Sequence, residues 1–255
     1  MTQARGAHAL LAVDVGNRLT KAARFQDGNL AAELAFPTEQ ALAPADLHDR
    51  ICALGDAGAL AVCSVVPRAT EAWQALARSS LGLEAFIIRG DTRCPLTNRY
   101  QPPESLGADR LAAAVAAHAA VAGAVIVVML GTAVTVDAVS GQGEFLGGAI
   151  APGVRTALEG LVAQAAQLGP IRVAKPEAAL ARTTEDAMRA GVVFGVIGQV
   201  RELVTRARRE LGAAAPVILT GGDADLVAGE IEGVHSLDRT LVLRGIYLIW
   251  RHNLQ

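Results

Sequence analysis

The chain has 255 residues, 52% of them hydrophobic and only 4% aromatic, so it can hold one large or two small domains with aliphatic cores. Its formal net charge is −2, and no basic stripe runs along it. Nucleic acid and anionic membrane surfaces are therefore poor partners. The three cysteines, Cys52, Cys63 and Cys94, form no CxxC pair and predict reduced thiols in a cytoplasmic protein.

Two segments bear on targeting. Residues 1–8 lack the cationic and then apolar order of a signal peptide. Residues 111–134 are long enough to reach the roughly 18 apolar residues of a membrane span. They are rich in alanine, however, and interrupted by His118, Gly123 and Gly131, so we expect a helix, a turn and a strand there. The sequence thus predicts a soluble intracellular protein.

Strands and helices alternate along the first half. Apolar runs predict strands at 10–13, 22–25, 30–36, 59–66 and 85–88. Helical spacing predicts helices at 45–54, opened by Pro44, at 69–77 and at 111–122. Residues 90–103 are expected to form a loop. The polar residues that follow place Asp109 and Arg110 in the first turn of the alanine-rich helix.

The second half repeats this plan. Residues 125–139 predict a hairpin, because an apolar run turns at Gly131 and returns with alternating polarity. A helix is expected from about Val154, and a long one over 184–211, with a break at 191–198 left open. Residues 216–219 predict a strand and 241–252 a closing helix. Helices that follow strands need a sheet to cover, so the sequence indicates an α/β architecture.

The hairpin at the start of each half has the same pattern. Superposing Gly16 on Gly131 gives an offset of 131 − 16 = 115 residues, which sets Asp14 opposite Met129 and Asn17 opposite Thr132. Two copies of one hairpin predict a duplicated domain with a cleft between the copies. We place the lobes at 1–118 and 119–255.

Glycines after buried strands suit phosphate binding. In Asp14-Val15-Gly16-Asn17 the glycine lets backbone N–H groups approach phosphate oxygens, and the carboxylate suits hydrated Mg²⁺. Thr220-Gly221-Gly222 follows another strand, where glycines leave room for a base or a ribose. Each motif is also compatible with a simple tight turn.

Taken together, these motifs resemble the acetate kinase/sugar kinase/Hsp70/actin superfamily, and within it the type III pantothenate kinases. The matching stretches occur in the family's order and cover nearly the whole chain: Asp14-Val15-Gly16-Asn17, Ser64-Val65-Val66-Pro67, Tyr100 with Gly107-Ala108-Asp109-Arg110, Gly131-Thr132-Ala133 with Thr135, residues 147–153 (Gly-Gly-Ala-Ile-Ala-Pro-Gly), Thr184-Glu185 and Thr220-Gly221-Gly222-Asp223. The resemblance implies two ribonuclease-H-like, actin-like ATPase lobes with a nucleotide cleft between them.

It also implies ATP- and Mg²⁺-dependent phosphorylation of pantothenate to 4′-phosphopantothenate, the first step of coenzyme A biosynthesis. Asp109 would accept the proton of the hydroxyl group, and Arg110 suits a substrate carboxylate. The family's substrate pocket maps to Tyr100, Gly107, Ala108, Asp109, Arg110 and Thr184, with Thr184 lent by the partner of a homodimer. Its ATP site maps to Asp14, Gly16, Asn17, Arg18, Lys21, Gly131, Thr132, Gly221 and Gly222.

The chain departs from the family pattern at three positions. Met129 stands where the family has an aspartate linked to a monovalent cation, K⁺ or ammonium, and a thioether is no substitute for a hard oxygen ligand. Arg18 interrupts the family's Asn-Thr-Asn, and Val134 replaces a threonine. Two interpretations of Arg18 remain open: it clamps phosphate in place of the cation, or it turns to solvent.

Three functions therefore compete at this stage. The first is a dimeric pantothenate kinase. The second is a diverged paralogue that phosphorylates another small hydroxy acid. The third is a catalytically weak nucleotide- or pantothenate-binding regulatory protein, which the loss of the aspartate at Met129 favours.

Overall fold

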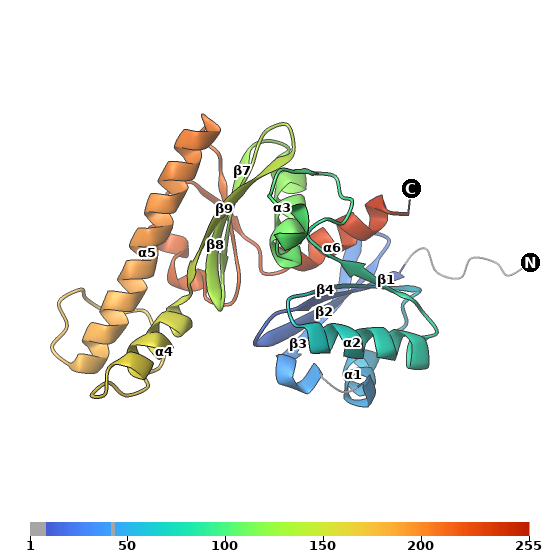
Figure 1. The fold of residues 1–255 in the computed structure, drawn as a ribbon, viewed down its shortest axis with the longest axis horizontal. Helices are drawn as coiled ribbons and strands as arrows, with labels where there is room; N and C mark the ends of the chain where they lie inside the picture. The colour runs from blue at the N-terminus through green and yellow to red at the C-terminus, as the bar shows by residue number, and fades with distance from the viewer. Residues whose placement is uncertain (1–8, 42–43, 255) are drawn as a thin grey trace, which may run out of the picture. The chain divides into compact units, whose positions relative to one another are not determined.

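The computed structural model describes residues 9–41 and 44–254, so the prediction made for residues 1–8 lies outside it. The described chain forms two compact units (Figure 1). The first contains the residues up to Ala116 together with those from Thr240 onward, and the second contains Ala117–Arg239. Within the described residues, none of the helices combines the length and apolar character that crossing a membrane requires.

The first unit is built on one mixed sheet. Its strands are β1 (Ala9–Val15), β2 (Leu19–Gln26), β3 (Asn29–Pro37), β4 (Ala59–Ser64) and β5 (Ala85–Ile88), in the order β3-β2-β1-β4-β5. β1, β2 and β3 pair antiparallel, whereas β4 runs parallel to β1 and β5 parallel to β4. The unit also contains the short β6 (Thr97–Asn98), α1 (Pro44–Ile51), α2 (Pro67–Leu76), the start of α3 (Ala108–Val121) and α6 (Leu241–His252).

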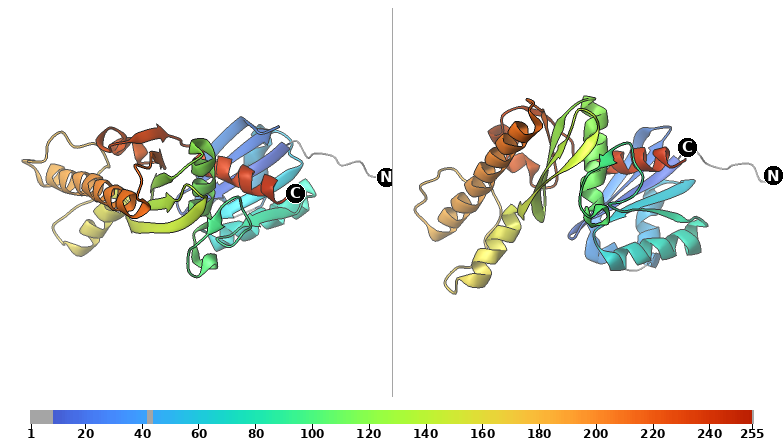
Figure 2. Two further views of the ribbon diagram at one scale, coloured as in Figure 1. Left: turned by 90° about the horizontal axis from the view of Figure 1, so that it is seen from above. Right: turned by 45° about the horizontal axis from the view of Figure 1, so that its top comes forward.

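The second unit repeats this topology. Its strands β7 (Val125–Leu130), β8 (Ala133–Val139), β9 (Glu144–Pro152), β10 (Val217–Thr220) and β11 (Val234–Leu237) lie in the order β9-β8-β7-β10-β11. β7, β8 and β9 pair antiparallel, and β10 and β11 continue the sheet in parallel. The helices α4 (Val154–Gln164) and α5 (Thr184–Leu211) pack against it (Figures 1 and 2). The predicted duplicated α/β fold is confirmed.

The two predicted hairpins occupy equivalent places in the two units. The Gly16 N–H donates to the Leu19 carbonyl oxygen at 3.1 Å, and the Gly131 N–H donates to that of Ala133 at 3.0 Å. The first turn is thus one residue longer than the second. Asp14 lies opposite Lys21 in β2, and Met129 occupies the equivalent row opposite Thr135 in β8. The expected correspondence between Asp14 and Met129 is therefore confirmed.

The two faces of the first sheet are covered by different helices (Figure 2). α1 and α2 bury one face in a cluster that contains Trp73. α6 covers the other face, where Tyr247 stacks on Phe25 with ring centroids 5.0 Å apart and an interplanar angle of 22°. Because side chains alternate along a strand, Asp14 and Cys63 point to the α6 side.

Several boundaries differ from those predicted. The helix expected at 45–54 leaves α-geometry after Ile51, and α5 continues through its glycines without a break. β9 and β11 were not predicted as strands. β9 was not predicted because its glycines weaken the sequence pattern of a strand. Gly148 lies opposite the buried Asp137, and a Cβ there would overlap the Asp137 carboxylate and the Val136 carbonyl.

The predicted second lobe, 119–255, extends too far along the chain. α6 packs on β1, β2 and β4 and belongs to the first unit. The sequence pattern identified this helix but not the sheet that it covers, since an amphipathic stripe does not specify its partner. The boundary expected after residue 118 lies close to the observed one after Ala116.

Candidate active site

Asp109 lies in the first turn of α3, as predicted. Its Oδ1 accepts a hydrogen bond from the backbone N–H of Arg110 at 2.9 Å. The carboxylate folds back over Gly107, where a Cβ would come within 2.7 Å of Oδ1. A larger residue at Gly107 would therefore displace this carboxylate. The Gly-Ala-Asp-Arg sequence thus fixes the orientation of the Asp109 carboxylate through local contacts.

Arg110 and Tyr100 form a second element beside Asp109. The Arg110 side chain is 4% exposed, and its guanidinium lies 5.2 Å from the centre of the Tyr100 ring. Its Nη1 donates to the Tyr100 hydroxyl oxygen at 3.5 Å. A planar cation held against an aromatic ring keeps its fork oriented, which suits a carboxylate ligand.

Asn98 holds the loop that carries Tyr100 and was not predicted. Its Nδ2 donates to the Gly90 carbonyl oxygen at 2.8 Å, and its Oδ1 accepts from the Tyr100 backbone N–H at 2.9 Å. These contacts close the loop at both ends. An asparagine in a polar, proline-rich stretch gives no sequence signal for this role, because its partners are backbone groups that only the fold brings near.

Asp14 and Asp109 influence each other's charge. Burial, and next the negative charge of Asp109, raise the pKa of Asp14 to about 7, and Lys21 opposes this effect. Burial also raises the pKa of Asp109, against the opposing effect of its hydrogen bond from the Arg110 backbone and of the Arg110 charge. The fold therefore brings the predicted ATP-side acid and the predicted acceptor-side acid into one poorly hydrated region.

Cys63 lies in the same region and was assigned no role from the sequence. It lies opposite Asp14 in the parallel pairing of β1 and β4 and is fully buried. Burial, with added repulsion from Asp14 and Asp109, raises the pKa of its thiol well above its ordinary value. The thiol is therefore neutral beneath two carboxyl groups. Only the strand register reveals this placement.

The raised pKa of Asp14 makes stability depend on pH. The folded protein holds this proton up to about pH 7, whereas the unfolded chain releases it near pH 4, so the acid destabilises the fold increasingly between these values. In metal-free buffer, Asp14→Asn should gain melting temperature relative to the wild type as the pH rises from 4 to 7, with a constant difference above 7. Thermal unfolding across this range measures it, and a difference independent of pH would contradict the shift.

The second unit brings its predicted glycines together. Gly221 has φ +101°, and a Cβ there would overlap the Leu130 carbonyl, so the turn after β10 lies against the end of β7. The Thr132 carbonyl oxygen accepts from the Thr156 hydroxyl at 2.6 Å and from the Gly153 N–H at 3.0 Å. The turn at Gly131 is thereby held beside the start of α4. A Cβ at Gly222 would meet no atom within 4 Å.

Met129 has polar neighbours but no acidic one in its own row. It lies opposite Thr135 in β8 and Thr220 in β10. Thr135 donates its hydroxyl to Oδ2 of Asp137 at 3.1 Å, and Asp137 is 1% exposed. Across the described part of the chain, the histidine, cysteine and acidic side chains nowhere gather in a group of three suited to a metal ion.

The predicted site residues fall in both units. The first holds the ATP-side residues of its hairpin and the acceptor-side group: Asp14, Gly16, Asn17, Arg18, Lys21, Tyr100, Gly107, Ala108, Asp109 and Arg110. The second holds Gly131, Thr132, Thr184, Gly221 and Gly222. Thr184 begins α5, two residues before Asp186, which lines a cavity of about 450 Å³; none of the predicted site residues lines that cavity. The cleft that would unite the two groups stays a prediction.

Comparison with known proteins gives matches along nearly the whole chain. A sequence model of the family described as type III pantothenate kinase matches residues 10–206. A protein named type III pantothenate kinase from Parafrankia sp. (strain EAN1pec) is 37% identical over 249 residues, covering 96% of this chain and 98% of that protein.

Solved structures share the fold at lower identity. A conserved putative Baf family transcriptional activator from Campylobacter jejuni is 20% identical, with a TM-score of 0.61 and coverage of 96% of this chain and 98% of that one. A ROK hexokinase from Thermus thermophilus is 13% identical, with a TM-score of 0.52 and coverage of 96% and 99%. At these identities the likeness extends to the fold alone.

Proposed function

This chain belongs to the type III pantothenate kinase family, and from that premise we propose that it transfers the γ-phosphoryl group of ATP to the hydroxyl group of pantothenate. The product is 4′-phosphopantothenate, formed in the first step of coenzyme A synthesis. The observation that carries the proposal is the acceptor-side group, in which Asp109 is fixed beside Arg110 and Tyr100.

Each of these side chains has a chemical task. Asp109 accepts the hydroxyl proton as the oxygen attacks the phosphoryl group, and its raised pKa makes it a better base than a fully hydrated carboxylate. Arg110 binds the pantothenate carboxylate through its fork, and Tyr100 holds the guanidinium in place. Because phosphoryl transfer depends mainly on positioning and charge stabilisation, an oriented acid and a fixed cation suffice on the acceptor side.

The ATP side is assigned to the two glycine turns and to Asp14. Asp14 fits a hydrated Mg²⁺, because its buried carboxyl group has a raised pKa that a nearby cation would lower again. When bound, Mg²⁺ neutralises charge on the phosphates. Backbone N–H groups at Gly16 and Gly131 are already paired within their turns, so the residues that follow them, Asn17 and Thr132, are the ones proposed to meet ATP.

The loss of a carboxylate at Met129 leads us to propose turnover without added K⁺ or ammonium. Arg18 is the residue by which the first turn exceeds the second, so it supplies a cation within a phosphate-binding turn. A coupled ADP-release assay with pantothenate, run with and without these cations, tests both proposals. Turnover without added K⁺ or ammonium supports both proposals. If turnover requires one of these cations, the proposed cation independence is wrong and only the proposed phosphoryl transfer stands.

Met129 also favours a second function, that of a regulatory protein which binds ATP or pantothenate with little turnover. The same assay separates the two when it is combined with calorimetry. If no ADP is released but calorimetry detects binding of ATP or pantothenate, the kinase function is contradicted and the regulatory function is supported. ADP release that begins only when another small hydroxy acid is supplied would identify a diverged paralogue.

We further propose a cytoplasmic homodimer in which each subunit lends Thr184 to its partner's acceptor site. The exposed side of α5 supports close contact between copies, since a Cβ at Gly191, Gly195 or Gly198 would meet no atom within 4 Å. Mixing the variants Asp109→Asn and Thr184→Ala tests it. If Thr184 acts across the interface, exchange of subunits should restore roughly a quarter of wild-type activity, since half of the dimers gain one intact site. No gain on mixing would assign Thr184 to its own subunit's site.

A further inference from the structure

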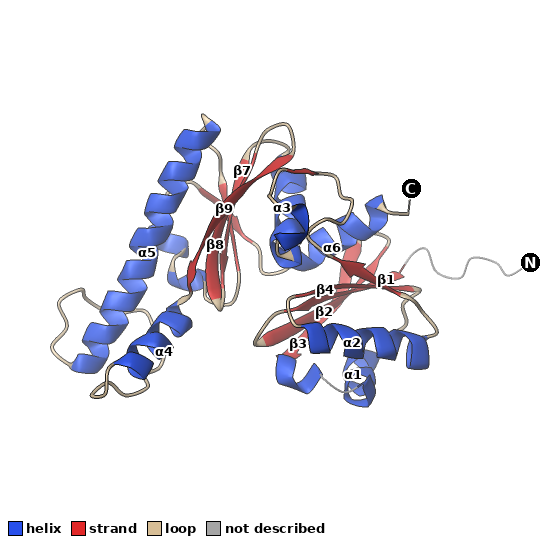
Figure 3. Ribbon diagram, viewed as in Figure 1, coloured by secondary structure: helices blue, strands red, loops and turns tan. Residues whose placement is uncertain are grey.

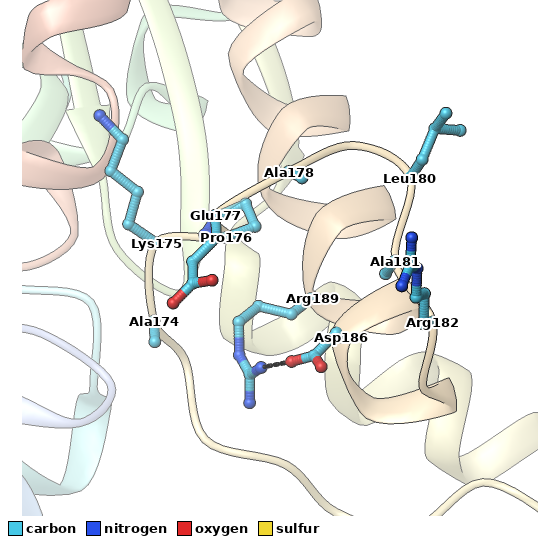
Figure 4. Close-up of a pocket in the computed structure, with 10 residues that line it drawn as sticks. All are labelled: Ala174, Lys175, Pro176, Glu177, Ala178, Leu180, Ala181, Arg182, Asp186 and Arg189. Carbon is cyan, nitrogen blue, oxygen red and sulfur yellow. Dashed lines mark hydrogen bonds and ion pairs between the residues drawn. The ribbon is translucent and has the colours of Figure 1, made fainter.

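The segment before α5 is ordered without regular secondary structure. Residues 165–183 contain no helix or strand, and Figure 3 shows this stretch as a long loop between α4 and α5. Residues 174–178 and 180–182 of the segment line the cavity of about 450 Å³ together with Asp186 and Arg189 of α5 (Figure 4). A loop of this length needs specific contacts to hold one conformation, because its backbone has few internal partners.

Arg189 provides such contacts. Its Nη1 donates to Oδ1 of Asp186 at 2.5 Å, and its Nη2 donates to Oε1 of Glu185 at 2.6 Å. Its Nε donates to the carbonyl oxygen of Arg172 in the loop at 3.4 Å. The side chain is only 14% exposed. One planar group therefore joins the loop to two residues in the first turn of α5.

The same turn is held from its other side. Thr183 caps the helix, since its Oγ1 accepts from the Asp186 N–H at 3.1 Å and donates to Oδ2 of Asp186 at 2.7 Å. Asp186 thus uses one carboxylate oxygen for Arg189 and the other for Thr183. Thr184 lies between these anchors. Its chain neighbours are held by the contacts between Thr183 and Asp186 on one side and by the pair of Glu185 with Arg189 on the other.

The charge arrangement requires this pairing. A helix N-terminus favours acids and disfavours cations, so an arginine near the first turn is tolerated when acids neutralise it. Glu185 and Asp186 both do so here. With these contacts made, the guanidinium is occupied within the protein, which favours a structural task over ligand binding.

We propose that Arg189 is a positioning residue for the acceptor substrate: it ties the 165–183 loop to the first turn of α5 and so fixes the hydroxyl of Thr184. The inference rests on the proposed function, in which Thr184 contacts pantothenate. It predicts an effect on substrate affinity rather than on the chemical step, since Arg189 itself contacts neither the acceptor nor the phosphates.

The chain offers a matched control on the same helix. Arg206 pairs with Glu202 at 2.7 Å with the same spacing of four residues, but its side chain is 64% exposed. An exposed pair of this kind contributes little to a fold. Arg206→Gln therefore makes the same chemical change as Arg189→Gln, at a position remote from the loop in sequence.

Two measurements test the proposal. In the pantothenate kinase assay, Arg189→Gln should raise KM for pantothenate by roughly tenfold with kcat nearly unchanged, as expected when binding alone is weakened. Arg189→Lys should have a KM between those of the wild type and Arg189→Gln, because lysine keeps the positive charge but lacks the planar guanidinium group. Limited trypsin digestion should cut Arg189→Gln faster than Arg206→Gln at Arg172 and Arg182, which lie within the loop.

The outcomes are separable. Should Arg189→Gln match Arg206→Gln in KM and in trypsin cleavage, the positioning role is overturned, and circular dichroism of each variant guards against loss of fold. Thr184→Ala run in the same assay tests the premise. If Thr184→Ala leaves KM for pantothenate unchanged, the proposed contact between Thr184 and pantothenate is wrong, and the inference about Arg189 falls with it. If Thr184→Ala raises KM but Arg189→Gln has the wild-type KM, only the inference about Arg189 is overturned.

Discussion

Replacing Asp109 with asparagine should lower kcat for pantothenate phosphorylation by at least about 100-fold, the usual effect of removing a positioned acid or base. Asparagine keeps the size of the side chain and can still accept the hydrogen bond from the Arg110 backbone, so the first turn of α3 should stay intact. What it loses is the ability to take the hydroxyl proton. The substitution also removes one of two mutually repelling acids, so stability should not fall.

The control is an acid within the loop at residues 90–103, which precedes α3. Asp91 is exposed in a turn after β5, and Asp91→Asn should leave kcat and KM unchanged. Calorimetry should show that Asp109→Asn still binds pantothenate, because Arg110 and Tyr100 remain in place. Wild-type turnover in Asp109→Asn would remove Asp109 from its role, and loss of binding would assign it to substrate recognition.

Elements with strong local patterns could be predicted from the sequence. β5 at Ala85–Ile88, α6 at Leu241–His252 and the start of α4 at Val154 are found where expected. Their periodicity and flanking residues carry this information within the segment itself. The paired hairpins could be predicted for the same reason, and because the second copy supports the first.

Other features depend on contacts that the sequence pattern does not carry. β9 is a strand although it contains Gly147 and Gly148. Glycine fits at position 148 because Asp137 on the neighbouring strand occupies the space that a side chain there would fill. Cys63 reaches the acid pair only through strand register, and Asn98 through backbone partners of the loop. On the acceptor side, by contrast, Asp109 and Arg110 are adjacent in sequence, so their motif alone is enough to propose them as site residues.

The second large effect is expected at Gly245, where α6 crosses α3. A Cβ at Gly245 would overlap the carbonyl of Ala112 in α3, so no rotamer change can relieve the contact. Gly245→Ala should therefore destabilise the protein by about 1–3 kcal/mol, the typical cost of overpacking a core, and more if the helices cannot separate. Since Asp109 lies one turn before Ala112 on α3, movement of this helix should also lower kcat.

The same substitution at Gly160 in α4 should have the opposite effect on the free energy of unfolding. It is exposed, and a Cβ there would meet no atom within 4 Å, so Gly160→Ala should stabilise the protein by up to about 1 kcal/mol through helix propensity alone. Urea unfolding of both variants measures the difference. Because propensity favours alanine equally in both helices, any destabilisation of Gly245→Ala reports the contact with α3. If the two variants were stabilised alike, α6 would not constrain the helix that carries Asp109, and the position of that acid would depend on Gly107 and the Tyr100 loop alone.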